Sequence, residues 1–167
     1  MRLITVLALS GLSLTAAACA SGPMEPASLS TGSGSPQPAE NYDWFLSEDG
    51  DEARLAYGLE ESDDLRIGLD CRRASGKLDL SAIAKAGARS EIHLESGGDT
   101  ERYPAHSEPS ELHDGLFLTA AARTSEPVFQ RFRRVGWLAV WQGEERNAYA
   151  PHPQSAERIE RFFAFCG

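Results

Sequence analysis

The seven residues from Leu65 to Cys71, LRIGLDC, decide the fold class of this chain. Apolar side chains stand at every second position, and polar or small residues stand between them. Neighbouring side chains of a strand point to opposite faces of its sheet, so this period of two predicts a strand with one buried face. A turn over residues 72–76 and a second alternating stretch over 77–82 follow, which predicts an antiparallel hairpin.

Similar short stretches lie on both sides of this hairpin. Apolar residues bounded by turns such as Asp49-Gly50 and Gly97-Gly98 predict further strands over 42–46, 53–57, 91–95, 116–120, 137–141 and 146–150. We therefore expect a mainly β (α+β) fold of about seven or eight strands, arranged as an antiparallel sheet or a small β-sandwich.

Two stretches have helical periodicity instead. In the first, we expect Ser125 to cap a short helix that starts at Pro127 and ends at Gly136. In the second, residues 153–166, charged side chains lie opposite an apolar stripe formed by Ala156, Ile159, Phe162, Phe163 and Cys166. We expect this C-terminal helix to pack on the sheet through its apolar stripe.

The N-terminus has the pattern of an export signal. Arg2 precedes a mostly apolar run over residues 3–14, which is shorter than the roughly 20 apolar residues of a membrane-spanning helix. Residues 14–19, LTAAAC, resemble the lipobox of bacterial lipoproteins. The resemblance implies that residues 1–18 are removed as a signal peptide and that Cys19 carries lipid, including palmitate. Ordinary secretion without lipid, with cleavage after Ala18 or Ala20, and an uncleaved N-terminal anchor are the alternatives.

The resemblance also implies a location. A chain lipidated on Cys19 is held to a membrane on the periplasmic side, in the cell envelope of a Gram-negative bacterium. Ala20 stands where an aspartate retains some lipoproteins in the inner membrane, so we expect the outer membrane. The membrane is thus an expected partner, and an envelope protein is a possible second one.

The cysteine count is consistent with lipidation. The chain has three cysteines, and lipid on Cys19 leaves Cys71 and Cys166 in an oxidising compartment. Cys71 lies on the apolar face of its expected strand, and Cys166 lies on the apolar stripe of its expected helix. We expect a structural disulfide between them, and a redox-active pair is the alternative.

Composition separates the remaining chain into a linker and a domain. Residues 19–41 are rich in Ser, Gly and Pro, which predicts a lipidated N-terminus on a flexible linker and leaves 42–167 as a single globular domain.

The net charge is −9, and residues 40–64 hold ten acidic residues and one basic residue. Nucleic acid is not an expected partner, because no basic excess is available to neutralise phosphates. We interpret the acidic segment as solvated surface, with cation binding or docking as the alternative.

Few residues form patterns that are typical of a metal, catalytic or cofactor site. His106, His113 and Asp114 are candidates for a metal site because they fall in one expected polar loop, although their spacing matches no recognised zinc motif. The mature chain has no Gly-x-Ser-x-Gly motif and no phosphate-cradling loop, so no catalytic residue and no cofactor is predicted.

Two further pairs of residues are candidates for ligand binding. Arg131 and Arg134 on the first expected helix could grip a carboxylate or phosphate, although they are also typical of the polar side of an amphipathic helix. Trp137 and Trp141 share one face of an expected strand, where they form either an aromatic platform for sugars or part of the core.

These features favour a non-catalytic binding or envelope-associated module and leave enzymatic activity open. One alternative is a metal-dependent hydrolase that uses His106 and His113. Another is an inhibitor of a cationic cell-wall hydrolase such as lysozyme. Lysozyme-inhibitor lipoproteins also combine a lipobox, a small β domain and a disulfide, and they carry a Ser-Gly-x-x-Tyr loop. Residues 96–100, SGGDT, are similar to that loop but place Thr100 where tyrosine is expected.

Overall fold

The computed structural model describes residues 35–111 and 114–167, so Cys19 and His113 lie outside the described residues. The described part is mainly β, as predicted, and contains two antiparallel sheets. The six-stranded sheet consists of β1 (Tyr42–Asp49), β2 (Glu52–Leu59), β3 (Leu65–Arg72), β4 (Lys77–Ala84), β8 (Leu116–Arg123) and β7 (His106–Pro109), in that order. The four-stranded sheet consists of β10 (Glu145–Tyr149), β9 (Leu138–Gln142), β5 (Glu91–Ser96) and β6 (Asp99–Pro104), in that order.

The number of strands differs from the prediction. Ten strands are present in the described residues, against the seven or eight expected. The two additional strands are β6 and β7, and each lies at the edge of its sheet. β7 falls within the segment that the sequence indicated as a polar loop. Both strands are polar, and Tyr103 of β6 is the one buried side chain between them, so neither shows a hydrophobic period of two.

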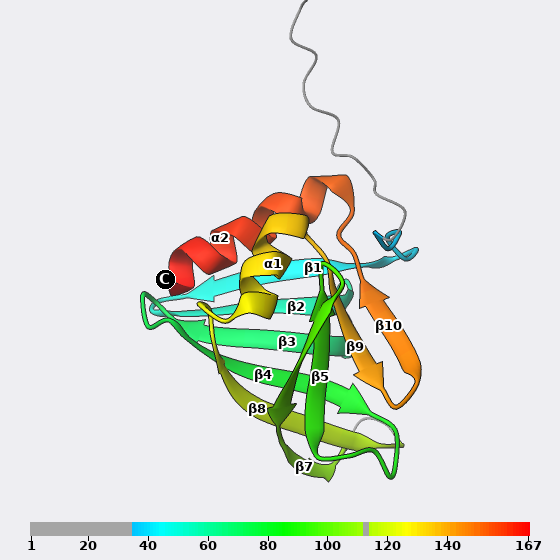
Figure 1. Cartoon of the computed structure of the whole chain (residues 1–167). Coiled ribbons are helices and arrows are strands. Elements are labelled where there is room, and N and C mark those ends of the chain that lie inside the picture. The colour runs from blue at the N-terminus through cyan, green and yellow to red at the C-terminus, as the bar shows by residue number, and fades with distance from the viewer. Residues whose placement is uncertain (1–34, 112–113) are drawn as a thin grey trace, which may run out of the picture. The chain divides into compact units, whose positions relative to one another are not determined.

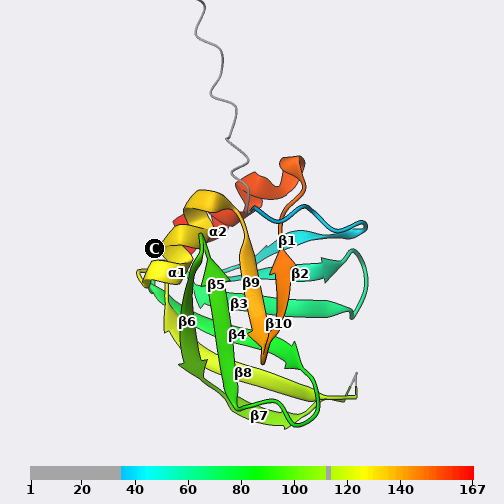
Figure 2. The same cartoon turned by 45° about the vertical axis from the view of Figure 1, so that its right-hand side comes forward.

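The strands of the four-stranded sheet run across those of the six-stranded sheet (Figure 1). β5 and β6 contact β8, so the smaller sheet covers the β8 side of the larger one. The other side, formed by β1, β2 and β3, contacts α2 (Ala156–Cys166), whereas α1 (Pro127–Val135) contacts β5 and β6. Figure 2 shows both helices at the same end of the strands of the smaller sheet. The core lies between these layers.

The core follows directly from the alternating sequence. Leu55, Ile67, Leu69 and Leu80 of the larger sheet are at most 1% exposed. The helices add an aromatic cluster in which the Phe132 ring lies 4.9 Å from Trp44 and 5.8 Å from Phe163, and the rings of Phe162 and Phe163 lie 5.5 Å apart. Each such buried side chain contributes about 1.5–3 kcal/mol to the free energy of folding.

The C-terminal helix packs on the larger sheet as predicted, and a disulfide joins the two. Cys71 of β3 and Cys166 of α2 are bonded, with their Cα atoms 5.8 Å apart. The turn after β3 adds backbone hydrogen bonds to the end of α2, from Ala74 N to Phe165 O and from Gly76 N to Cys166 O, both 2.9 Å. A short 3-10 turn over Pro153–Ser155 precedes α2.

The start of α1 differs from the prediction. Glu126, rather than Ser125, occupies the N-cap position, and no side chain caps the helix. Gly136 ends the helix as expected, in the left-handed conformation at φ 81°, with its N–H bonded to Phe132 O at 2.8 Å. This conformation favours glycine because it has no Cβ.

Candidate functional site

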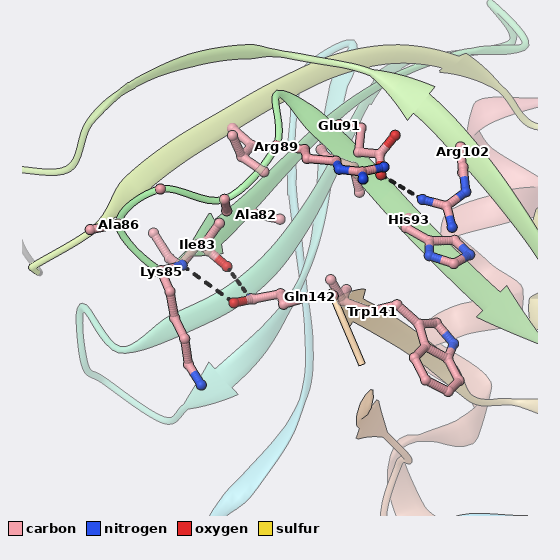
Figure 3. Close-up of a pocket in the computed structure, with 17 residues that line it drawn as sticks. Ala82, Ile83, Lys85, Ala86, Arg89, Glu91, His93, Arg102, Trp141 and Gln142 are labelled. Carbon is pink, nitrogen blue, oxygen red and sulfur yellow. Dashed lines mark hydrogen bonds and ion pairs between the residues drawn. The ribbon is translucent and has the colours of Figure 1, made fainter. Parts of the chain in front are cut away.

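A cavity of about 480 Å³ opens between the two sheets where β4, β5 and β9 come together (Figure 3). Its inner wall consists of buried apolar residues from both sheets: Ala82, Ala84, Ile92, Leu118 and Val140. Its size and apolar wall are those of a site for a small organic molecule. The segment between β4 and β5, residues 85–90, forms one side of the mouth.

Basic side chains predominate at the mouth. Lys85, Arg89 and Arg102 line it together with a single acidic residue, Glu91. The Lys85 ammonium pairs with Glu145, which lies outside the cavity lining, and Arg102 pairs with Glu91. Arg89 forms no ion pair within the part of the chain that the structure describes. Figure 3 shows Arg89, Glu91 and Arg102 grouped on one side of the mouth and Lys85 on the other.

The Gln142 side chain ties the two sheets together beside the cavity. Its Nε2 donates to Ile83 O at 2.8 Å, and its Oε1 accepts from the Lys85 backbone N–H at 3.3 Å. Gln142 also lines a second hollow of about 520 Å³, whose other lining residues include Tyr57 and Tyr149. Gln142 therefore lies between the two hollows, and its amide links β9 to the end of β4.

Trp141 of β9 also lines the cavity, but its indole ring points away from Ala82, Ile83 and Gln142 (Figure 3). Strand pairing places Arg102, His93, Trp141 and Arg146 in one row across the outer face of the four-stranded sheet. The His93 and Trp141 rings stack with their centroids 6.1 Å apart. The Trp141 Nε1–H donates to Glu95 Oε2 at 2.7 Å, which fixes the orientation of the indole ring.

Glu95 is a buried carboxylate on the outer face of a sheet. It is 8% exposed, and Arg146 donates to both of its oxygens, from Nε at 2.7 Å and from Nη2 at 2.9 Å. The same guanidinium lies 5.2 Å from the Trp137 ring centroid. Glu95 and Arg146 therefore join the two tryptophans that the sequence placed on one face. Trp141 lines the cavity, whereas Trp137 is buried in a separate small cluster with Ala139 and Ala150.

These contacts set the protonation of the site. The hydrogen bonds from Arg146 hold the pKa of Glu95 below its ordinary value, against the opposing effect of burial. Burial lowers the pKa of His93, and the positive charge of Arg102 lowers it further. Its Nε2 atom is buried without a hydrogen-bond partner in the described structure. At neutral pH the site therefore holds an ionised Glu95 and a neutral His93.

The other predicted binding residues do not reach this cavity. The Arg131 side chain is 15% exposed and binds Ser96 O at 2.8 Å and Glu101 Oε1 at 3.3 Å, so its contacts hold α1 to the β5–β6 hairpin. Arg134 is exposed in the last turn of α1 and forms no ion pair with another described residue. A basic residue there interacts favourably with the C-terminal end of the helix.

The predicted metal-site residues do not form a cluster in the described structure. His106 is exposed on β7 opposite Thr119, and Asp114 is exposed before β8. Among residues 35–111 and 114–167, no three His, Cys, Asp or Glu side chains are placed to hold a metal ion.

The turn that resembles the lysozyme-inhibitor loop is part of the β5–β6 hairpin. The Ser96 side chain is fully buried and donates to Trp137 O at 2.8 Å. A Cβ on Gly97 would lie 3.2 Å from the Arg131 Cδ. The turn therefore packs against α1, and its serine hydroxyl is used within the fold.

The acidic segment is divided between opposite ends of β2. At the β1–β2 end, Glu48, Asp51 and Glu52 pair with Arg161, Arg73 and Arg72. At the β2–β3 end, Asp64 pairs with Arg66 and accepts a hydrogen bond from the Tyr42 hydroxyl at 2.5 Å. The charge surplus therefore does not form one continuous patch along the strand.

Comparisons with protein-family models, with curated proteins and with solved structures found no match for the chain. In the described residues, no helix has the length and apolarity needed to cross a membrane.

Proposed function

We propose that this protein is a lipid-anchored binding module of the bacterial cell envelope, held on the periplasmic side by lipid on Cys19. The outer membrane is the proposed location. The ligand is a small, largely apolar molecule that enters the cavity between β4, β5 and β9. The protein binds this ligand without transforming it.

The cavity is the observation that carries this proposal. Its wall of Ile92, Leu118 and Val140 contains no charged side chain, so an apolar ligand gains the free energy of leaving water there. A site that is already formed in the folded protein binds without a large ordering cost.

The polar groups around the cavity favour binding over catalysis. A general base needs a free lone pair and a pKa near the working pH. Glu95 does not meet the second requirement, because the hydrogen bonds from Arg146 lower its pKa, and its carboxylate already accepts three hydrogen bonds from Arg146 and Trp141. His93 stacks on Trp141, and no described serine or cysteine side chain is bonded to it. This arrangement orients an aromatic ring and does not activate a nucleophile.

The lipid anchor rests on the sequence of residues 1–19 and on the linker that follows. A linker of about twenty Ser-, Gly- and Pro-rich residues has a mean span of roughly 25 Å, so a tethered domain can sample the space next to the membrane. An anchored binding module would keep a poorly soluble ligand close to the bilayer.

A neutral fluorescent probe tests the binding site. The mature chain, residues 19–167, is to be produced with Cys19→Ala, because it carries neither lipid nor the apolar signal segment and so needs no detergent that would compete for the cavity. N-phenyl-1-naphthylamine, whose fluorescence rises in apolar surroundings, is then titrated in. We expect saturable binding of one probe molecule per chain.

Two tryptophan substitutions locate the probe. Ala88 lines the mouth and is half-buried, so Ala88→Trp should block entry and abolish the fluorescence increase. Ala164 is exposed on α2, and Ala164→Trp should leave the titration unchanged. Absence of saturable binding, or equal binding by the Ala88→Trp variant, would contradict the proposal.

A further inference from the structure

The charges at the mouth of the cavity define the ligand further, and this inference rests on the proposed function. The lining holds three basic side chains and one acidic side chain, in a protein whose net charge is −9. The mouth therefore has the opposite sign to the chain as a whole. A positive surface in an acidic protein needs a local reason, because like charges held near one another repel.

Two of the three basic groups have a partner. Lys85 pairs with Glu145, and Arg102 pairs with Glu91. The Arg89 guanidinium has no ion pair with a described residue, and it lies at the mouth beside Glu91 (Figure 3). One positive charge is thus left uncompensated at the entrance to an apolar cavity.

This juxtaposition matches an amphipathic ligand with one negative charge. The apolar wall takes a hydrocarbon tail, and a guanidinium at the entrance matches the two oxygens of a carboxylate. An uncharged apolar ligand would leave the positive charge of Arg89 unpaired. A head group with several negative charges would carry more charge than Arg89 can neutralise. We propose that the cavity binds a medium-chain carboxylate, with its tail on Ile92 and Val140 and its head group at Arg89 and Arg102.

Three probes of equal chain length separate the contribution of the head-group charge to the binding affinity from that of the apolar tail. Octanoate, octanol and octylamine are to be titrated into the mature chain, residues 19–167, carrying Cys19→Ala, with displacement of N-phenyl-1-naphthylamine as the readout. We expect octanoate to bind about tenfold more tightly than octanol, because a charge-assisted hydrogen bond has roughly that effect on affinity. Octylamine should bind more weakly than octanol.

Arg89→Gln removes the uncompensated charge without breaking an ion pair of the described structure. This variant should bind octanoate and octanol with equal affinity. Arg123→Gln is the matched control, because Arg123 is exposed on β8 away from the cavity, and it should leave all three affinities unchanged.

The outcomes distinguish this inference from the proposed function. Equal binding of octanoate and octanol by the unsubstituted cavity, or an undiminished preference for octanoate after Arg89→Gln, would overturn the carboxylate assignment and leave the apolar site intact. Failure of all three probes to displace N-phenyl-1-naphthylamine would also overturn it, while binding of that dye would still support the cavity. If the dye does not bind either, both proposals fall.

Discussion

The indole N–H of Trp141 donates a 2.7 Å hydrogen bond to the carboxylate of Glu95, across two neighbouring strands of the four-stranded sheet. Glu95 is held in turn by two hydrogen bonds from Arg146. The indole ring of a residue that lines the cavity is therefore fixed by a charged group that does not itself line the cavity. Glu95 is a positioning residue for Trp141.

Glu95→Gln should weaken this arrangement. The neutral amide cannot accept two charge-assisted hydrogen bonds from Arg146, and we expect the free energy of unfolding at pH 7 to fall by about 1–2 kcal/mol. Urea unfolding measures this change. Glu144→Gln, at an exposed position in the β9–β10 turn, is the control and should have no effect.

The effect of Glu95→Gln should depend on pH. Because the folded protein lowers the pKa of Glu95 below 4.5, its contribution to stability is fully present above about pH 4.5. It is lost as the pH falls through the lower pKa of the folded state. The difference in unfolding free energy between the two proteins should therefore be constant from pH 7 to 5.5 and shrink towards pH 3. A difference that grows on acidification would contradict this account of the site.

Gln142→Met should loosen the link between β9 and the end of β4. The substitution keeps an unbranched side chain of similar length but removes the hydrogen bonds to Ile83 O and Lys85 N. We expect a loss of about 1–2 kcal/mol in stability and faster amide hydrogen exchange at Lys85. Gln154→Met, at an exposed site in the turn before α2, serves as the control. Unchanged exchange at Lys85 would show that the amide does not hold β4 and β9 together.

The disulfide should stabilise the whole domain against unfolding, and not only the contact between β3 and α2. Cys71 and Cys166 are separated by 95 residues, so the bond restricts most of the unfolded chain. The double variant Cys71→Ala/Cys166→Ala should lose about 2–4 kcal/mol of unfolding free energy. A redox-active pair, in contrast, would be reduced readily, and a loss well below 1 kcal/mol together with ready reduction by dithiothreitol in the folded protein would favour that reading.

Lipidation should depend on Cys19 alone. Radiolabelled palmitate should be incorporated into the full chain in a Gram-negative host, and Cys19→Ala should abolish the label. Cys71→Ala keeps Cys19 and should retain it. Labelling that persists in Cys19→Ala would exclude the lipobox interpretation, and labelling absent from both variants and from the unsubstituted chain would favour ordinary secretion.

The sequence predicts the fold where burial leaves a local pattern. The stretch from Leu65 to Cys71 alternates because one face of β3 is in the core, and the stripe of α2 is apolar because it covers the same sheet. The edge strands β6 and β7 have almost no buried side chains, so their strand structure depends on pairing with β5 and β8. Pairing of this kind leaves no periodicity in the strand itself.

The candidate site was only partly predictable for a related reason. Trp141 stood out in the sequence as a large aromatic residue. Its partner Glu95 lies 46 residues away, and the sequence showed it only as one polar residue of an expected strand. The two hydrogen bonds of Gln142 span 57 and 59 residues. Arg89 and Arg102 became candidates for ligand binding only because they line the cavity, and the cavity forms only where the two sheets cross. Periodicity reports which face of an element is buried, and it does not report which residues meet at the end of a sandwich.

Intermolecular nuclear Overhauser effects test the central claim most directly. The Cys19→Ala protein, labelled on its methyl groups, is to be saturated with N-phenyl-1-naphthylamine. If the cavity is the binding site, the aromatic protons of the probe should show contacts to the methyl groups of Ile92, Leu118 and Val140, together with a shift of the Trp141 indole N–H. Contacts confined to methyl groups outside the cavity, with an unchanged Trp141 signal, would contradict it.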